Sequence, residues 1–174
     1  MNLHDLELMA RGGTLALLTL WSLLLWRDHR AQLAARCAIA MNAAIGCYVI
    51  VTAGWSESPS PLGLLFSLGA GATPSLFWLF SKTWFEDRTQ IARRDLALIA
   101  LASLNTLVMQ LTFGSDLRVN TFSALLFRMA MLAFAGAALW HAWHGREGDL
   151  IEGRRRVRFW LVLTVGLYVI AITF

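Results

Sequence analysis

Apolar residues run along this chain in long, almost unbroken stretches. Six of them meet or approach the roughly 20 residues that a helix needs to cross the hydrocarbon core of a bilayer. They cover residues 8–26, 37–55, 62–82, 96–113, 122–143 and 157–174. β-Strands are excluded because the stretches are too long and show no two-residue alternation. We therefore predict an all-α, polytopic transmembrane helix bundle that residues 1–174 form as a single domain.

The composition points to the same class of protein. Of the 174 residues, 57% are hydrophobic and only 15% are charged, and the mean hydropathy is +0.58. Soluble domains contain about 25% charged residues. The net charge of +4 lies on residues that flank apolar stretches, where basic side chains orient helices and contact lipid headgroups. We expect the lipid bilayer as a partner and no direct binding of nucleic acid by this chain.

Lysine and arginine fall into alternate gaps between the stretches. The gaps after the first, third and fifth stretches contain twelve of them, whereas Arg11 and Arg118 belong to the other side. The twelve are Arg27, Arg30, Arg36, Lys82, Arg88, Arg93, Arg94, Arg146, Arg154, Arg155, Arg156 and Arg158. By the positive-inside rule they face the cytoplasm, and the N-terminus lies outside. Arg11 is expected to extend outward to the interface.

The remaining tryptophans and cysteines fit this arrangement. Most tryptophans lie near predicted span ends, where aromatic belts form, but Trp21 and Trp78 lie deeper and are expected to pack inside the bundle. Cys37 and Cys47 are about 15 Å apart if they share a helix, which is too far for a disulfide. We interpret them as packing residues.

Two segments resemble a known family. They are Pro74–Phe80, continued by Phe85–Asp87, and Gly148–Trp160. With the N-out topology, they resemble the membrane domain of bacterial AraC-type transcriptional regulators. The resemblance implies a seven-span sensor followed by a cytoplasmic helix-turn-helix domain. That DNA-binding domain is absent here, and six spans that begin outside also end outside, so we expect a seventh span in a longer parent protein.

Arg128 is the one charge that we assign to the interior of a span. Inserting an arginine at the bilayer centre costs roughly 2.5–3.5 kcal/mol of free energy on insertion scales. We expect Asn105 and Gln110, in the same outer half of the neighbouring span, to accept its hydrogen bonds. One hypothesis is an outward-facing polar pocket for a small-molecule ligand. The alternative, which we favour, is a snorkelling side chain with a structural bond between helices.

The loop before the last stretch is the most distinctive polar segment. Its charged residues could couple the signal to an attached cytoplasmic domain, or could simply stop transfer through the membrane, which we favour because exposed ion pairs contribute little. The residues concerned are Asp149, Glu152, Arg154, Arg155, Arg156 and Arg158.

Gly69, Gly71 and Pro74 predict a kink in the third span, because proline removes a backbone donor and glycine permits close packing. The kink could act as a hinge, although we favour a static bend. His141 and His144 share a helix face, but a metal site needs further ligands. We predict no metal, cofactor or catalytic residues, and therefore no enzyme.

The most concrete functional prediction is an inner-membrane sensor domain of a transcriptional regulator. It would pass a ligand or membrane signal to a cytoplasmic DNA-binding domain of the parent protein. A homodimer is compatible with this function. The alternatives are a small multi-pass transporter or channel, for which the sequence shows no internal repeat, and a non-catalytic membrane scaffold subunit.

Overall fold

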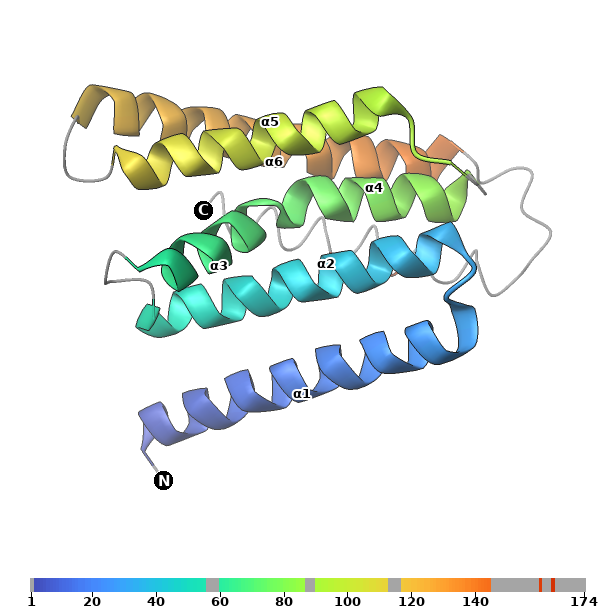
Figure 1. The fold of residues 1–174 in the computed structure, drawn as a ribbon, viewed down its shortest axis with the longest axis horizontal. Coiled ribbons are helices and arrows are strands. Elements are labelled where there is room, and N and C mark those ends of the chain that lie inside the picture. The colour runs from blue at the N-terminus through green and yellow to red at the C-terminus, as the bar shows by residue number, and fades with distance from the viewer. Residues whose placement is uncertain are drawn as a thin grey trace.

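The structure, a computed structural model, describes residues 2–55, 60–86, 90–112 and 117–144 together with Trp160 and Thr164. Within this part of the chain all regular structure is helical (Figure 1). The elements are α1 (Leu3–His29), α2 (Leu33–Ile50), a π-helical turn η1 (Val51–Trp55), α3 (Pro61–Gly71), α4 (Thr73–Phe85), α5 (Arg93–Leu111) and α6 (Leu117–His144). The all-helical prediction is confirmed for these residues.

Four helical segments are long and apolar enough to cross a membrane. They are His4–His29, Leu33–Ala53, Arg93–Leu111 and Arg118–Trp143. The pair α3 and α4 passes the same test together but is bent by 42°, which would make a fifth span. The sixth predicted span, 157–174, lies outside the described residues except for Trp160 and Thr164. The described helices are therefore those of a membrane protein, and they account for four or five of the six predicted spans.

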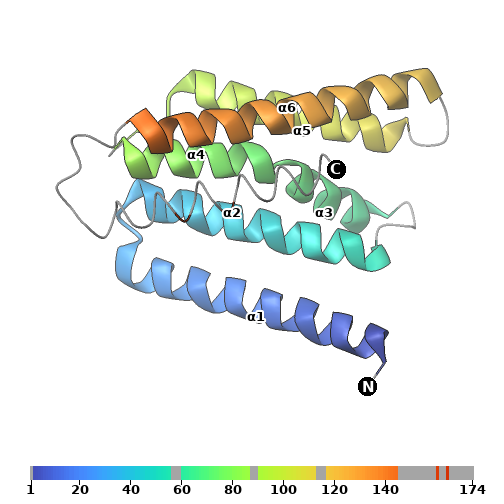
Figure 2. The same ribbon diagram turned by 180° about the vertical axis from the view of Figure 1, so that it is seen from behind.

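The helices run up and down, so their ends gather at two ends of the bundle (Figures 1 and 2). Helix α2 and the bent pair α3–α4 lie in the middle, with α5 and α6 on one side and α1 on the other. Among the described helices α1 packs against α2 alone. We call the end with Arg27, Arg30, Arg36, Arg93 and Arg94 the arginine-rich end.

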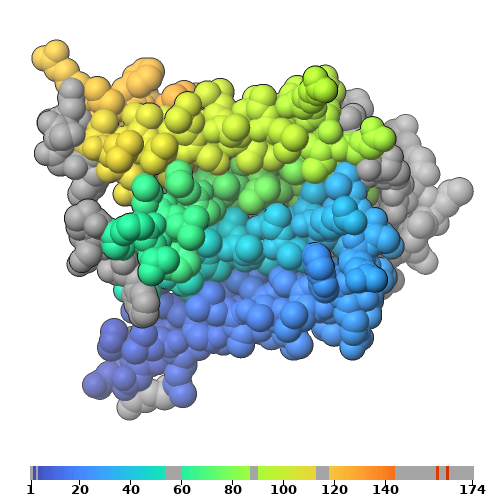
Figure 3. All heavy atoms as spheres, in the orientation of Figure 1, coloured from blue at the N-terminus to red at the C-terminus, as the bar shows by residue number. Residues whose placement is uncertain are grey.

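Small and polar side chains fill the interior, whereas large apolar ones point outward. Five of the nine buried hydrophobic residues are alanines, and Leu20, Leu101 and Phe122 are each more than half exposed. Figure 3 shows the outer surface of α1, α2, α3 and α5. A bundle with small residues inside and large apolar residues outside is typical of membrane proteins, where small residues let helices approach and large ones contact lipid. Trp78 is buried as expected, but Trp21 is 60% exposed, so its predicted packing role is wrong.

The third predicted span is broken at Ala72, between α3 and α4. Pro74 has no N–H to donate to the Ala70 carbonyl four residues earlier. After the break, the Ala72 carbonyl accepts both the Leu76 N–H at 3.0 Å and the Ser75 hydroxyl at 2.9 Å. The glycines before the break lie close to other helices. A Cβ on Gly71 would clash with the side chain of Thr106 in α5, and one on Gly69 would lie 2.6 Å from Cys47 Sγ. The bend lies where glycine and proline occur in the sequence.

Arg11 does not simply extend outward as expected. Its guanidinium donates to Glu7 in α1 and, at 3.0 Å, to both the Val49 carbonyl and the Thr52 hydroxyl where α2 passes into η1. A π-helical turn alters the regular pattern of carbonyl acceptors, and Arg11 bonds one of the carbonyls next to that turn. Its side chain is only 24% exposed. Arg11 therefore joins α1 to the end of α2.

Candidate functional site

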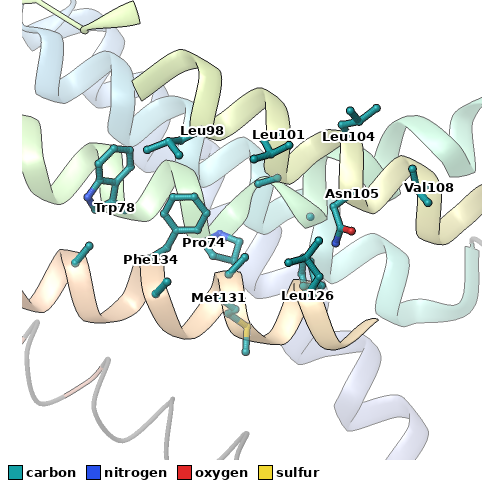
Figure 4. A pocket seen from close by; sticks show the side chains of 16 residues that line it. Pro74, Trp78, Leu98, Leu101, Leu104, Asn105, Val108, Leu126, Met131 and Phe134 are labelled. Atoms are coloured by element: carbon teal, nitrogen blue, oxygen red, sulfur yellow. The ribbon is translucent and has the colours of Figure 1, made fainter. Parts of the chain in front are cut away.

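A cavity of about 560 Å³ lies between α5 and α6, above the break between α3 and α4 (Figure 4). Its volume is within the roughly 300–1,000 Å³ range of ligand pockets. Gly71 and Pro74 line it at the break, and Trp78 lines it toward the arginine-rich end. Alanines and larger apolar side chains from α5 and α6 form the rest. Asn105 is the one hydrogen-bonding side chain besides Trp78 among the described lining residues.

The rim of the cavity consists mainly of leucines. Leu98, Leu101, Leu104 and Leu126 line it and are 42%, 64%, 54% and 47% exposed. Apolar side chains exposed on a membrane-spanning helix contact lipid. The cavity is therefore continuous with the lipid-facing surface of α5 and α6.

Asn105 and Arg128, two of the residues predicted to bind a ligand, lie apart. Asn105 lines the cavity, and its Nδ2 donates to the Ser123 carbonyl of α6 at 3.1 Å. Arg128 is exposed and, at about 100° per residue, lies roughly 150° around α6 from the middle of the lining face. Gln110 is half-buried and lies about 140° around α5 from Asn105. Only Asn105 belongs to the cavity, and its hydrogen bond joins the two helices.

A buried ion pair joins α4 to α5 at the arginine-rich end. The Lys82 Nζ lies 2.6 Å from Asp95 Oδ1, and the two side chains are only 5% and 2% exposed. Asp95 is in the first turn of α5, where a carboxylate is stabilised by the helix dipole, and its Oδ2 accepts the Ala92 N–H at 3.4 Å. Lys82 is in the last turn of α4, where a cation is stabilised in the same way. Each charge therefore suits the helix end that holds it.

Trp78 connects this ion pair to the cavity. Its indole lines the cavity, and the Lys82 ammonium lies 4.8 Å from the centre of the same ring, within the roughly 6 Å of a cation–π contact. The ring also packs against Phe134 of α6, with centroids 5.6 Å apart. Any movement of the Trp78 ring in the cavity would therefore also change its contact with Lys82.

A second polar pair lies beside the first. His141 Nδ1 of α6 is 2.5 Å from Glu86 Oε1, at the end of α4, and the His141 ring lies 6.5 Å from that of Trp78. Glu86 is thus a pairing partner that the sequence analysis did not assign to His141. No group of three or more metal-ligating side chains occurs among residues 2–55, 60–86, 90–112 and 117–144.

The predicted coupling residues of the last loop, Asp149 to Arg158, lie outside the described residues. The two ion pairs were missed because we assigned Lys82 to a topology signal and treated Arg128 as the one charge inside a span. For the Lys82–Asp95 pair the sequence did contain a signal: Asp95 is an acidic residue at the start of an apolar stretch. Because only a short connection separates it from Lys82, a contact between the two neighbouring helix ends could have been predicted.

Comparison with protein-family models, with curated proteins and with solved structures finds no match to this chain.

Proposed function

We propose that this chain is the membrane-embedded sensor domain of a bacterial transcriptional regulator, with a cytoplasmic DNA-binding domain in the parent protein. The observation that carries the sensing role is the position of Trp78, which lines an open cavity and contacts the buried cation Lys82. The resemblance of Pro74–Phe80 and Gly148–Trp160 to AraC-type membrane domains supports the identity of the effector. The alternating arginines support an inner-membrane location with the arginine-rich end inside.

In this proposal the cavity is the input and the arginine-rich end is the output. A ligand shifts a conformational equilibrium only as far as it binds one state better than the other. A ligand in the cavity would favour one position of Trp78 and one angle between α3 and α4, because Trp78 and the residues at the break line the same cavity. The change would pass along α4 to Lys82 and move α4 together with α5, because Lys82 stays paired with Asp95. The loop of residues 149–158 and the expected seventh span would then carry it to the effector.

The experiment compares two tryptophan variants of the full-length parent protein in its own host. Trp78→Leu removes the ring between cavity and ion pair, and Trp21→Leu removes an exposed ring as the matched control. We expect deletion of the gene to change a defined set of transcripts. Wild type and Trp21→Leu should restore them, whereas Trp78→Leu, at equal abundance in the membrane, should not. Unchanged transcripts on deletion, or a reading frame without a DNA-binding region, would contradict the proposal.

The bent pair α3–α4 supports a second candidate, a small transporter. Transporters often bind substrate where a membrane helix is discontinuous, and the cavity lies at such a break. Flux of a solute into proteoliposomes that contain the purified chain would favour this function. Loss of that flux in Trp78→Leu but not in Trp21→Leu would place the pathway at the cavity.

A further inference from the structure

We propose that the cavity between α5 and α6 binds one acyl chain of a bilayer phospholipid, which enters sideways from the membrane and lies parallel to the helices. This names the ligand class of the proposed sensor and rests on that function for its biological meaning. Binding itself is inferred from the described helices α3 to α6, whose residues line the cavity.

The shape of the cavity fits an extended chain. Its lining runs along α5 from Leu98 to Val108 and along α6 from Leu126 to Ala137. At 1.5 Å per residue these intervals are roughly 15 Å long, about half of the hydrocarbon core of roughly 30 Å. Because α5 and α6 run side by side (Figures 1 and 4), the long dimension follows the helices, as acyl chains do in a bilayer.

The chemistry of the lining favours an apolar occupant over water or a polar ligand. The lining is apolar apart from two side chains: Asn105, which donates one hydrogen bond to the Ser123 carbonyl, and Trp78, whose Nε1 has no hydrogen-bond partner among the described residues. A buried water needs two to four polar partners, and apolar cavities stay dry. An uncharged hydrocarbon chain requires no such partners.

The rim favours lipid over a second protein copy. Helices associate in membranes through small residues and interhelical hydrogen bonds, because apolar surface alone packs equally well against lipid. The rim here is made of the four exposed leucines, Leu98, Leu101, Leu104 and Leu126, and of Ala133, while the other lining alanines are half-buried. An acyl chain can pass between leucines and reach the alanines, whereas a helix would rest on the leucines.

The test uses the full chain in nanodiscs that contain a phospholipid with a diazirine midway along one acyl chain. After irradiation, mass spectrometry measures labelling of the lining residues relative to Leu20 and Leu23 of α1, which are exposed without lining the cavity. In the wild-type protein, the half-buried lining residues Met131 and Phe134 should be labelled above this reference. Ala102→Phe, which fills the cavity, should lower the ratio about tenfold, equivalent to about 1.4 kcal/mol.

Ala100→Phe is the matched control, because Ala100 lies on the same helix but is exposed and does not line the cavity. It should leave the ratio unchanged. Ala130→Leu fills the cavity from α6 with a smaller side chain and should lower the ratio even if Ala102→Phe fails to fold. Equal labelling of cavity and α1 in wild type, or equal ratios in all variants, would overturn the proposal. Cross-links between two copies through α5 and α6 would also overturn it.

The labelling experiment and the transcription experiment can fail independently. Labelling in nanodiscs needs no effector domain. A labelled cavity, together with unchanged transcripts on deletion of the gene, would therefore contradict the sensor function and retain the lipid site. Transcriptional control lost in Trp78→Leu, together with an unlabelled cavity, would retain the sensor and remove the acyl-chain ligand.

Discussion

The two ends of α4 differ in what they bury. At the arginine-rich end, Lys82 and Asp95 are almost completely buried and paired at 2.6 Å. At the other end, Pro74 and the adjacent Gly71, the last residue of α3, line a cavity that is open between leucines. One end holds strong, directional contacts, and the other holds weak, non-directional ones. The difference indicates that one end of α4 is fixed to α5, whereas the packing of the other end can adapt.

The physical reason is the environment of each contact. Breaking a buried ion pair leaves an uncompensated charge in a medium of low dielectric constant, which is strongly unfavourable. Apolar contacts in a membrane are exchanged for equivalent contacts with lipid at little cost. Helix α4 can therefore change its packing at the cavity while Lys82 and Asp95 keep it attached to α5.

Asp95→Ala tests the fixed end and has the largest expected effect. It leaves Lys82 buried without its carboxylate, which should lower the free energy of unfolding by about 3–5 kcal/mol. The measurement is thermal or denaturant unfolding of the purified chain in detergent micelles.

The double variant Lys82→Met with Asp95→Leu is the control. It removes both charges and keeps apolar volume, and such replacements are often neutral or stabilising. If the double variant is as unstable as Asp95→Ala, the cause is lost packing and not the unpaired charge, and the fixed end is misassigned.

Gly71→Ala tests the close approach of the α3–α4 break to α5. The added Cβ would lie 2.8 Å from the Cβ of Thr106 and closer still to its hydroxyl. Overpacking of this kind costs roughly 1–3 kcal/mol. Gly136→Ala is the matched control, because nothing lies within 4 Å of its added Cβ, and alanine there should stabilise α6 by up to about 1 kcal/mol. Equal unfolding midpoints for the two variants would show that the break can relax.

The helices were predictable from the sequence because a bilayer demands long apolar stretches. The predicted 96–113 and 122–143 correspond to α5 and α6 within about five residues. Both helices begin earlier than predicted because polar residues continue them toward the N-terminus, and α5 ends two residues earlier, at Leu111. The break at Ala72 was predictable from Pro74, since proline removes a donor wherever it lies. The sequence therefore predicts the position of each helix along the chain, but not how the helices pack against one another.

The site could be predicted only in part, because it depends on how helices face one another. Asn105 was identified as a polar residue in a span, but its partner is the Ser123 carbonyl, and backbone acceptors carry no sequence signal. Arg128 lies on another face of α6, which hydropathy alone does not reveal. The contact of Trp78 with Lys82 joins residues one helical turn apart, so periodicity could have suggested it.

Arg11→Ala tests the attachment of α1, the least connected of the described helices. It removes hydrogen bonds to the Val49 carbonyl and the Thr52 hydroxyl. Because the Arg11 side chain is partly exposed, we expect a loss of about 1 kcal/mol in unfolding free energy. Arg27→Ala is the control, since Arg27 is 73% exposed and its described pair is with the adjacent Asp28, so no measurable change is expected. Proteolysis of α1 that is unchanged in Arg11→Ala would contradict this role.

Glu86→Gln has the smallest expected effect and sharpens the comparison within the arginine-rich end. Glu86 and Asp95 are both carboxylates paired to a basic side chain from another helix, but their side chains are 31% and 2% exposed. The amide of glutamine keeps an oxygen that can accept from His141, and a partly exposed pair contributes about 0–1 kcal/mol. We therefore expect the unfolding free energy of Glu86→Gln, measured in the same micelles, to stay within about 1 kcal/mol of wild type. A loss as large as that of Asp95→Ala would mean that both pairs hold this end of the bundle, and that burial does not distinguish them.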